Sequence, residues 1–518
     1  MQLLKLFGRN KQQVTNGDPI LDEPLCWFSE YDPFTVRNAC EGVSIFGGVG
    51  SGKSSGSGRT LALEYLSSGM GGLVLCAKIE EREVWQKYAH MTGRTDDLII
   101  ISKESGIRFN PLDYMLSRKG GASSTENIVR TVCDSLDISG SNNDGGEDGG
   151  YFTKTKEQLI RNGVDLFRLA GEKLSITGLF RLVRSAPKLA DLESIDWQKG
   201  SYCYQLVLEA RKNIRALKEE GGTSAKNNVT SHASMDDFIE CVKYWLDEFP
   251  SIPDKTRLNI ISTFTSSVEP LTRGALNTLF SGETDVTPEE AFSGKGTSAK
   301  PINGKIIIVD YPVKEWLNAG IFIQATIKKL FQQAAEMRPV SNDTTPSFLW
   351  VDEAQNFIES YDMDFFATSR GARICPVYMS QNISNYYSKI DNRSVVDSIL
   401  ANLSTKIFHA NNDFVTNKWA SDHIGQGVRQ LYSSNTSLSE SPSNDAFDDT
   451  FMFNKPSNAS VSSSVSETYA YQVEPNEFFK LRKGGYENDL KVDAIIVQSG
   501  RIWNFTETNW LVTEFSQS

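Results

Sequence analysis

The 518-residue sequence has few cysteines, and their spacing fits neither a metal site nor a disulfide framework. The seven cysteines are scattered along the chain, their number is odd, and no C-x-x-C pair occurs. This pattern indicates neither zinc binding nor structural disulfides. It favours a reducing, cytoplasmic environment.

The sequence also lacks a long hydrophobic run. A transmembrane helix needs about 20 consecutive apolar residues, and no segment approaches that length. The opening residues, MQLLKLFGRNKQQ, lack the apolar centre of a signal peptide. We therefore expect a cytoplasmic protein that reaches a membrane only through partners. A surface anchor formed by Leu3 to Phe7 is the alternative.

Positive charge is not in excess, because 53 Lys and Arg stand against 65 Asp and Glu, for a formal net charge of −12. This balance does not suggest a protein coated with nucleic acid, although a local basic stripe would suffice to bind DNA. The composition, 39% hydrophobic and 23% charged, is typical of a globular protein, and the length allows two or three domains.

What the sequence does contain is a glycine-rich loop, GGVGSGKS, at Gly47 to Ser54. It matches G-x-x-x-x-G-K-[ST], follows the apolar run 42–46 and precedes a segment, 55–67, that can form a helix. Glycines let successive backbone N–H groups turn toward phosphate oxygens at the positive end of that helix. Lys53 would then reach the β and γ phosphates of ATP, and the Ser54 hydroxyl would bind Mg²⁺. A flexible linker is the alternative, because SGSG follows. The predicted nucleotide-binding residues are Gly47, Gly48, Val49, Gly50, Ser51, Gly52, Lys53, Ser54 and Ser55.

An NTPase also needs an acidic residue at the end of a neighbouring strand. The apolar run FLWV, 348–351, is followed directly by Asp352 and Glu353. We predict that Asp352 holds the magnesium shell and that Glu353 polarises the attacking water. Asp310 ends another apolar run and is the competing candidate, ranked second because a tyrosine rather than an acid follows it.

Apolar, β-rich runs alternate with helical segments, which is typical of an α/β fold with a mostly parallel sheet and helices on both faces. From about Asp113 to Glu283 the strand runs cease and helical periodicity replaces them. We therefore predict an N-terminal segment with the first part of a nucleotide-binding domain at 1–112, an inserted all-helical domain at 113–283, and the second part at 284–518. The runs predicted as strands are 72–76, 98–101, 305–309, 348–351, 374–379 and 405–409.

Three segments rich in Gly, Asn and Ser are predicted as loops, since their composition cannot pack a core. They are 139–150, 221–234 and 433–466. Beyond the last of them, 492–498 is predicted as a C-terminal edge strand.

Four segments together resemble the coupling-protein ATPases of conjugative type IV secretion, which belong with the FtsK-like and HerA-like DNA translocases. The segments are GGVGSGKSSGSGRTLALEYL, FNPLDY at 109–114, FLWVDEAQNF at 348–357 and SRGARICPVYMSQN at 369–382. The resemblance spans most of the chain and extends to VEPNEFFKLRKGG, which begins at Val473.

This resemblance implies a RecA-like P-loop NTPase core with an inserted all-α domain, assembled as a hexamer that uses ATP and Mg²⁺ to move DNA. Relaxase or secretion-channel proteins are the partners that it implies. Typical family members begin with transmembrane helices, which this sequence does not show. The alternatives are a secretion ATPase that moves protein or nucleoprotein, and an ATP-gated assembly protein that recruits an effector.

The resemblance also implies roles for two further residues. In the family, an arginine after the acidic motif reaches the γ-phosphate bound by the adjacent subunit, and Arg370 matches that place, with Arg373 as a close rival. Gln381 matches a polar residue that senses the phosphate, although a buried or turn-capping glutamine is the alternative. The predicted catalytic residues are Lys53, Glu353, Arg370 and Gln381.

Overall fold

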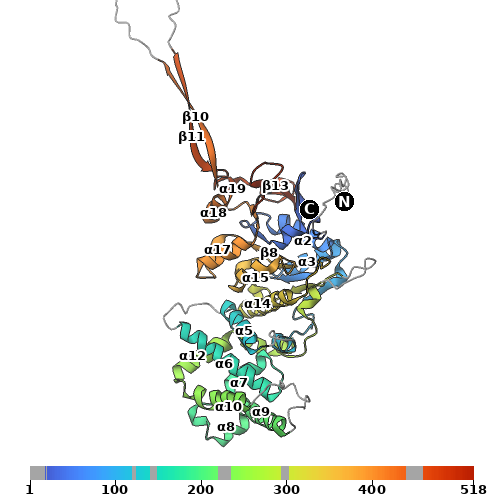
Figure 1. Cartoon of the computed structure of the whole chain (residues 1–518), viewed down its shortest axis with the longest axis vertical. Helices are drawn as coiled ribbons and strands as arrows, with labels where there is room; N and C mark the ends of the chain where they lie inside the picture. The colour runs from blue at the N-terminus through green and yellow to red at the C-terminus, as the bar shows by residue number, and fades with distance from the viewer. Residues whose placement is uncertain are drawn as a thin grey trace, which may run out of the picture.

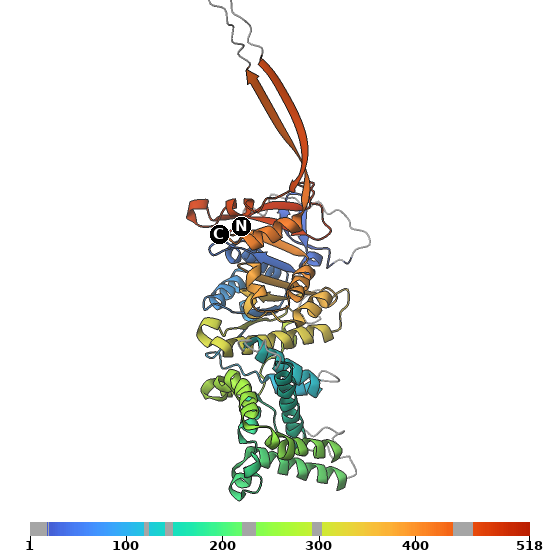
Figure 2. The same cartoon turned by 90° about the vertical axis from the view of Figure 1, so that its left-hand side faces the viewer.

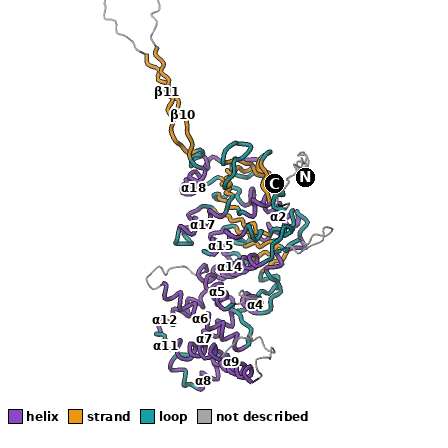
Figure 3. The backbone as a smooth tube through the Cα atoms, viewed as in Figure 1, coloured by secondary structure: helices purple, strands orange, loops and turns teal. Residues whose placement is uncertain are grey.

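A computed structural model describes residues 18, 20–118, 124–139, 149–219, 235–292, 303–438 and 459–518. The molecule is elongated, with a central body built on a large sheet, a body of helices at one end and a two-stranded ribbon that projects from the other (Figure 1; Figure 2). Colouring by secondary structure separates these parts, because the strands gather in the central body and in the ribbon (Figure 3). The predicted surface anchor, Leu3 to Phe7, lies outside the described residues.

Nine strands form the central sheet, in the order β13-β12-β9-β3-β8-β7-β4-β6-β5. All neighbouring pairs from β9 to β5 are parallel. Each of the six apolar runs predicted as strands forms one of them, so the α/β fold with a mostly parallel sheet is confirmed. The bounds are β3 (Val43–Phe46), β4 (Gly72–Leu75), β5 (Leu98–Ile101), β6 (Ile306–Val309), β7 (Ser347–Val351), β8 (Ile374–Ser380), β9 (Thr405–His409), β12 (Lys491–Gln498) and β13 (Trp510–Ser516).

Helices cover both faces of the sheet, so successive side chains of each central strand are buried in opposite cores. Leu73 and Val351 belong to the core on one face, whereas Val74 and Trp350 belong to the core on the other. A strand buried on both faces reads as a continuous apolar run, which explains why these strands are visible in the sequence. One face packs against α2 (Arg59–Ser67) and α3 (Glu81–Met91), and the other against α14 (Val313–Met337), α15 (Tyr361–Ser369), α17 (Arg393–Asn402) and α18 (Phe414–Ile424). Shorter elements of the central body are β1 (Pro24–Ser29), β2 (Asp32–Thr35), α1 (Val36–Cys40), α16 (Ile383–Tyr387) and α19 (Glu477–Lys480).

The predicted C-terminal edge strand, 492–498, forms as β12 but does not lie at an edge. β12 pairs antiparallel with both β9 and β13, so β13 is the edge on that side. The prediction was wrong because β13 alternates buried and exposed residues, as one-sided packing requires, and such alternation over seven residues is a weaker signal than an apolar run.

Between residues 111 and 291 every described element is helical. The ends of the predicted loop 139–150 belong to α5 and α6, while 140–148 and 221–234 lie outside the described residues. The exact division into domains stays a prediction. None of the described helices has the length and apolar character that a membrane span needs. The helices are α4 (Pro111–Ser117), α5 (Thr125–Ser139), α6 (Gly149–Ala170), α7 (Ile176–Ser185), α8 (Ile195–Gly200), α9 (Tyr202–Glu219), α10 (Met235–Lys243), α11 (Phe249–Ser251), α12 (Asp254–Val268) and α13 (Gly274–Ser281).

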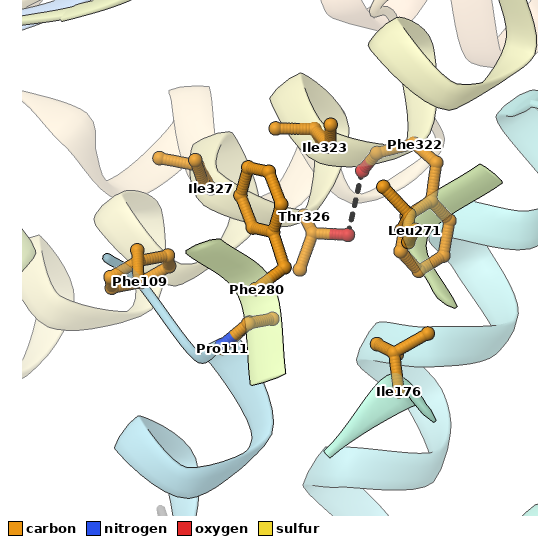
Figure 4. Close-up of a pocket in the computed structure, with 9 residues that line it drawn as sticks. All are labelled: Phe109, Pro111, Ile176, Leu271, Phe280, Phe322, Ile323, Thr326 and Ile327. Atoms are coloured by element: carbon orange, nitrogen blue, oxygen red, sulfur yellow. Dashed lines mark hydrogen bonds between the residues drawn. The ribbon is translucent and has the colours of Figure 1, made fainter. Parts of the chain in front are cut away.

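Apolar side chains join the helical body to α14 of the central body. Ile176 and Phe280 of the helical body lie around a small pocket that Phe322 and Ile327 of α14 close from the other side (Figure 4). Thr326 also lines this pocket, and its hydroxyl donates a hydrogen bond of 2.7 Å to the carbonyl oxygen of Phe322. The hydroxyl is therefore satisfied in apolar surroundings, and the seam packs as a hydrophobic contact.

The projecting ribbon consists of β10 (Gln426–Leu438) and β11 (Ala459–Tyr471), which pair antiparallel over their whole length. The prediction of a loop at 433–466 was therefore wrong at both flanks, while 439–458 lies outside the described residues. The reason is that a two-stranded ribbon is joined by backbone hydrogen bonds, so it forms without the apolar residues that a packed core requires.

Candidate nucleotide-binding site

The glycine loop at 47–53 directly follows β3 and leads into a helix, as the motif requires. The helix begins with one π turn, Ser54–Gly58, and continues as α2, so the SGSG segment is helical. Gly50 and Gly52 have φ angles of 71° and 85°, which glycine adopts without strain. A side chain at Gly52 would also collide with Val492 of β12, whose Cγ1 would lie 2.4 Å from the added Cβ. Glycine is needed here both for its torsion and for close packing against β12.

The acidic pair lies beside this loop. Only β8 separates β3 from β7 in the sheet, so the carboxyl ends of β3 and β7 open on the same side. The Ser54 hydroxyl donates a hydrogen bond of 2.9 Å to Asp352 Oδ2. This contact joins the two predicted magnesium ligands across 298 residues of sequence.

Glu353 is held in a strained and buried position. Its φ of 46° and ψ of 48° are left-handed, which costs a residue other than glycine of order 1 kcal/mol. The residue is 7% exposed. Its carboxylate lies 3.6 Å from the Lys53 ammonium and accepts a hydrogen bond of 2.8 Å from Gln355 Nε2. Non-glycine residues in this conformation cluster at functional sites.

The charges around Glu353 determine its ionisation. Burial by itself would raise the pKa of this carboxyl, but Lys53, the hydrogen bond from Gln355, and Lys78 outweigh burial and hold the pKa at about 2. The carboxylate is therefore charged at neutral pH. It is a weak base while both ammonium groups face it, and its basicity rises when either moves away.

Gln381, directly after β8, reaches the same carboxylate. Its Nε2 lies 3.4 Å from Glu353 Oε1, and its backbone oxygen accepts a hydrogen bond of 2.8 Å from Asn411 Nδ2. The structure therefore brings the predicted polar site residues together at the carboxyl ends of the parallel strands, with Arg370 as the exception.

The competing acid, Asp310, also lies at the carboxyl end of a strand, but farther from the loop. It follows β6, which β4 separates from β7. Burial raises its pKa, although an ion pair of 2.9 Å with Arg82 opposes that shift. Because the hydroxyl of Ser54 bonds Asp352, the geometry favours Asp352 as the acid beside the loop.

The two arginines, Arg370 and Arg373, precede β8 and thus lie at the amino ends of the parallel strands, opposite the nucleotide loop. Arg373 is 4% exposed, donates to two carbonyl oxygens of the segment before β7, and pairs with Asp18 at 2.5 Å. The Arg370 side chain is 56% exposed and pairs with Glu41 at 3.2 Å. The seven residues of β8 span about 20 Å, which is more than an arginine side chain can reach. Any contact of Arg370 with a nucleotide site would therefore be with the site of another subunit.

Sequence reasoning missed Lys78 and Gln355, which contact the acidic pair, and His409, which contacts the helix after the loop. Lys78 follows β4, and its ammonium lies 3.0 Å from Asp352 and 3.0 Å from Glu353. Lys78 lies just beyond the carboxyl end of β4, and His409 is the last residue of β9, so both lie at the end of the sheet that carries the loop. A search for polar residues at strand ends, as is usual for ligand sites in open α/β sheets, would have found both.

His409 contacts the first turn of the helix that follows the loop. Its Nδ1 lies 3.0 Å from the carbonyl oxygen of Asp493 and therefore carries the proton, so that Nε2 accepts a hydrogen bond of 2.7 Å from the Ser57 hydroxyl. Burial lowers the pKa of His409 to about 4, which keeps the ring neutral at pH 7. The histidine acts as a structural support for the helix that follows the loop.

The residues around the loop fit a magnesium nucleotide. The buried hydroxyl of Ser51 has no hydrogen-bond partner among the described residues, and Val49 at the tip of the loop is 79% exposed. Ser54 and Asp352 supply the oxygen ligands that Mg²⁺ prefers. Lys53 lies next to them and supplies the positive charge that phosphate requires.

Comparison with solved structures shows the same fold in a bacterial conjugative coupling protein, TrwB. The unbound form of TrwBdeltaN70 matches with a TM-score of 0.56 and 12% identity, covering 94% of this chain and 87% of that one. TrwB with the non-hydrolysable ATP analogue ADPNP gives the same values. TrwB with ADP and Mg²⁺ gives a TM-score of 0.54 at 12% identity, over 94% of this chain and 87% of that one. The predicted RecA-like P-loop NTPase fold is confirmed by these matches.

A comparison with protein families gives one match at the sequence level. Residues 346–481 match the model described as the TraM recognition site of TraD and TraG. This segment runs from the residue before β7 to the residue after α19, and it contains the acidic pair, Arg370 and Gln381. No curated protein sequence matches the chain. The predicted resemblance to the conjugative coupling proteins is thus confirmed, in fold over nearly the whole chain and in sequence over residues 346–481.

Proposed function

We propose that this protein is an ATPase of the coupling-protein type, which forms a ring and uses ATP hydrolysis to move DNA. The observation that carries the ATPase proposal is the hydrogen bond of 2.9 Å between the Ser54 hydroxyl and Asp352, with Lys53 beside Glu353. The hydrogen bond joins the two residues proposed to hold Mg²⁺, and the Glu353 carboxylate lies beside the lysine proposed to bind the γ-phosphate. TrwB, which shares the fold, has been solved with ADPNP and with ADP and Mg²⁺.

In this proposal each residue of the cluster has one role. Lys53 binds the β and γ phosphates, and Ser54 and Asp352 hold the magnesium ion. The bound ion neutralises phosphate charge. Glu353 accepts a proton from the attacking water, which becomes easier once Lys53 turns from the carboxylate toward phosphate. Gln381 and Gln355 fix the orientation of the Glu353 carboxylate through their amide groups.

The ring is proposed from the position of Arg370. Its side chain is exposed and lies at the amino ends of the strands, opposite its own nucleotide loop. This position suits a contact with the nucleotide of a neighbouring subunit. Arg373 is buried and bonded to two carbonyl oxygens and to Asp18, which argues against it as the rival. The resemblance to coupling proteins suggests that the ring is a hexamer.

DNA is proposed as the cargo because of the similarity to the conjugative coupling proteins. The family model that matches residues 346–481 is described as the TraM recognition site of TraD and TraG, so a TraM-like partner is proposed for this segment. Relaxase or secretion-channel proteins are the further partners that the resemblance to coupling proteins implies, and such contacts would bring the protein to a membrane. Protein or nucleoprotein cargo and an ATP-gated assembly role are the alternatives, and both keep the same ATPase centre.

ATP turnover measured without DNA, with single-stranded DNA and with duplex DNA, together with the particle mass in each condition, tests the proposal. We expect DNA to stimulate turnover and to promote a hexamer. Glu353→Gln is the matched control, since it keeps the shape of the site and should abolish the stimulated activity. Turnover that is indifferent to DNA would favour another cargo, and a complete absence of turnover would refute the ATPase itself.

A further inference from the structure

Lys78 lies in a loop that is built to hold it. The loop connects β4 to α3, and the carboxylate of Glu81, the first residue of α3, accepts hydrogen bonds from the backbone N–H groups of Ala77 at 2.6 Å and of Lys78 at 3.3 Å. The second oxygen of Glu81 is buried, has no hydrogen-bond partner among the described residues, and lies 4.0 Å from the Lys78 ammonium. The loop backbone is therefore fixed, and the carboxyl group of Glu81 faces the lysine.

The ammonium of Lys78 contacts both members of the acidic pair. It lies 3.0 Å from Asp352 Oδ2 and 3.0 Å from Glu353 Oε1. Asp352 Oδ2 is the same oxygen that accepts the hydrogen bond from Ser54, while Asp352 Oδ1 accepts one of 2.8 Å from the backbone N–H of Glu353. The oxygen that faces the predicted magnesium position is therefore already bound to a cation.

We propose that Lys78 is a resident counter-cation that competes with Mg²⁺ for Asp352, so that a magnesium nucleotide binds only as Lys78 leaves this carboxylate. An ammonium and a divalent ion in contact with one oxygen would lie a few ångströms apart and repel each other strongly at a partly buried site. This inference rests on the proposed ATPase function and adds to it a lysine that the motif does not include.

The two lysines of the site differ in their freedom to move. The side chain of Lys53 is 9% exposed, whereas the side chain of Lys78 is 36% exposed on a flexible stem. Lys78 can therefore turn toward solvent or toward phosphate at low cost. The exchange replaces one positive charge on Asp352 by the charge of the ion.

Binding of a fluorescent, non-hydrolysable ATP analogue to the full chain at increasing free Mg²⁺ tests the proposal. For Lys78→Met we expect the half-saturating Mg²⁺ concentration to fall about threefold to tenfold, the range that loss of one charge-assisted, partly exposed contact provides. Lys78→Arg retains the charge and should behave as the wild type. Lys305→Met is the matched control, because Lys305 is 38% exposed and also pairs with a carboxylate, Asp97, but at the amino ends of the strands, away from the loop.

Thermal melting in EDTA gives an independent reading. Lys78→Met should melt at a lower temperature than the wild type, since Asp352 and Glu353 lose a counter-ion, and saturating Mg²⁺ with the analogue should remove the difference. An unchanged magnesium midpoint, unchanged melting in EDTA, or loss of analogue binding at saturating Mg²⁺ would each overturn the proposal. Failure of the wild type to bind the analogue would instead refute the proposed function.

Discussion

Lys328 of α14 is predicted to be essential to the stability of the central body. Its side chain is fully buried, and its ammonium donates to both carboxylate oxygens of Asp362, at 2.9 and 2.8 Å, and to the carbonyl oxygen of Phe357 at 2.7 Å. Glu359 lies 3.2 Å away. Phe357 follows the short turn after the acidic pair, so this one ammonium ties α14 to the segment that carries Glu353.

The substitution Lys328→Met keeps most of the volume and removes the charge. Removal of one partner from a buried ion pair typically costs about 3–5 kcal/mol, because the other charge stays buried. Asp362 keeps three donors, the backbone N–H of Glu359 at 3.0 Å, Gln332 at 2.7 Å and Tyr378 at 3.1 Å. We therefore expect the lower end of that range, about 3 kcal/mol.

The loss should also depend on pH. Burial raises the pKa of Glu359, and Lys328 opposes that shift, so without Lys328 the pKa of Glu359 in the folded state rises further above its value in the unfolded chain. The folded state then binds more protons than the unfolded state, and the stability of the variant falls as pH rises above the unfolded value. The deficit relative to the wild type should be larger at pH 8 than at pH 5.5.

Urea unfolding followed by tryptophan fluorescence at these two pH values measures the effect. Hydrogen exchange over α15 and residues 354–357 reports whether the loosening reaches the acidic pair. Lys418→Met is the matched control, because Lys418 forms an exposed ion pair with Asp422 in α18 and its loss should leave the unfolding midpoint unchanged. A variant as stable as the wild type at pH 8, or an equal deficit at both pH values, would refute the reasoning.

Three further predictions concern the nucleotide site. Glu353→Gln should still bind the ATP analogue while turnover falls roughly 100-fold or more, because the amide cannot accept a proton; loss of analogue binding would contradict the assigned role. Arg370→Ala should lose roughly 1,000-fold in turnover without losing stability, and mixing it with Lys53→Ala should restore part of the activity in mixed rings, whereas no recovery would place Arg370 outside the neighbouring site. His409 has a folded pKa of about 4, below the ordinary value of 6.5. The unfolded chain therefore binds more protons, and stability present above pH 6.5 should be lost as pH falls toward 4. Thermal melting between pH 4 and 7 should show a smaller loss for His409→Gln, and equal pH dependence in both proteins would contradict this.

The sequence was sufficient where the signal is local. The glycine loop is a run of eight residues between an apolar strand and a helix, and each central strand is buried on both faces, so both are written in consecutive residues. The strand β13 and the ribbon of β10 and β11 were missed because one-sided packing and backbone pairing leave a weak trace in composition.

The acidic pair shows where local information stops. The sequence ranked Asp352 above Asp310 because an acid follows Asp352. Each of the two residues, however, directly follows an apolar strand, so their local sequence contexts are similar. The order of the strands decides between them, since β8 alone separates β7 from β3. The contact of 2.9 Å between Ser54 and Asp352 exists only because the sheet brings those strand ends together.

The same reason explains the residues that sequence could not assign. Lys78 lies 274 residues from Asp352 along the chain. Its place just beyond a strand end makes it a candidate, but only the fold shows that it contacts the acidic pair. Arg370 and Arg373 are three residues apart in similar surroundings of sequence, but one is exposed and the other is buried among carbonyl groups and Asp18. Local sequence thus determined the elements and the phosphate loop. Which strand ends become neighbours, and which charges are buried, depends on long-range packing of the whole chain, and only the tertiary structure decided it.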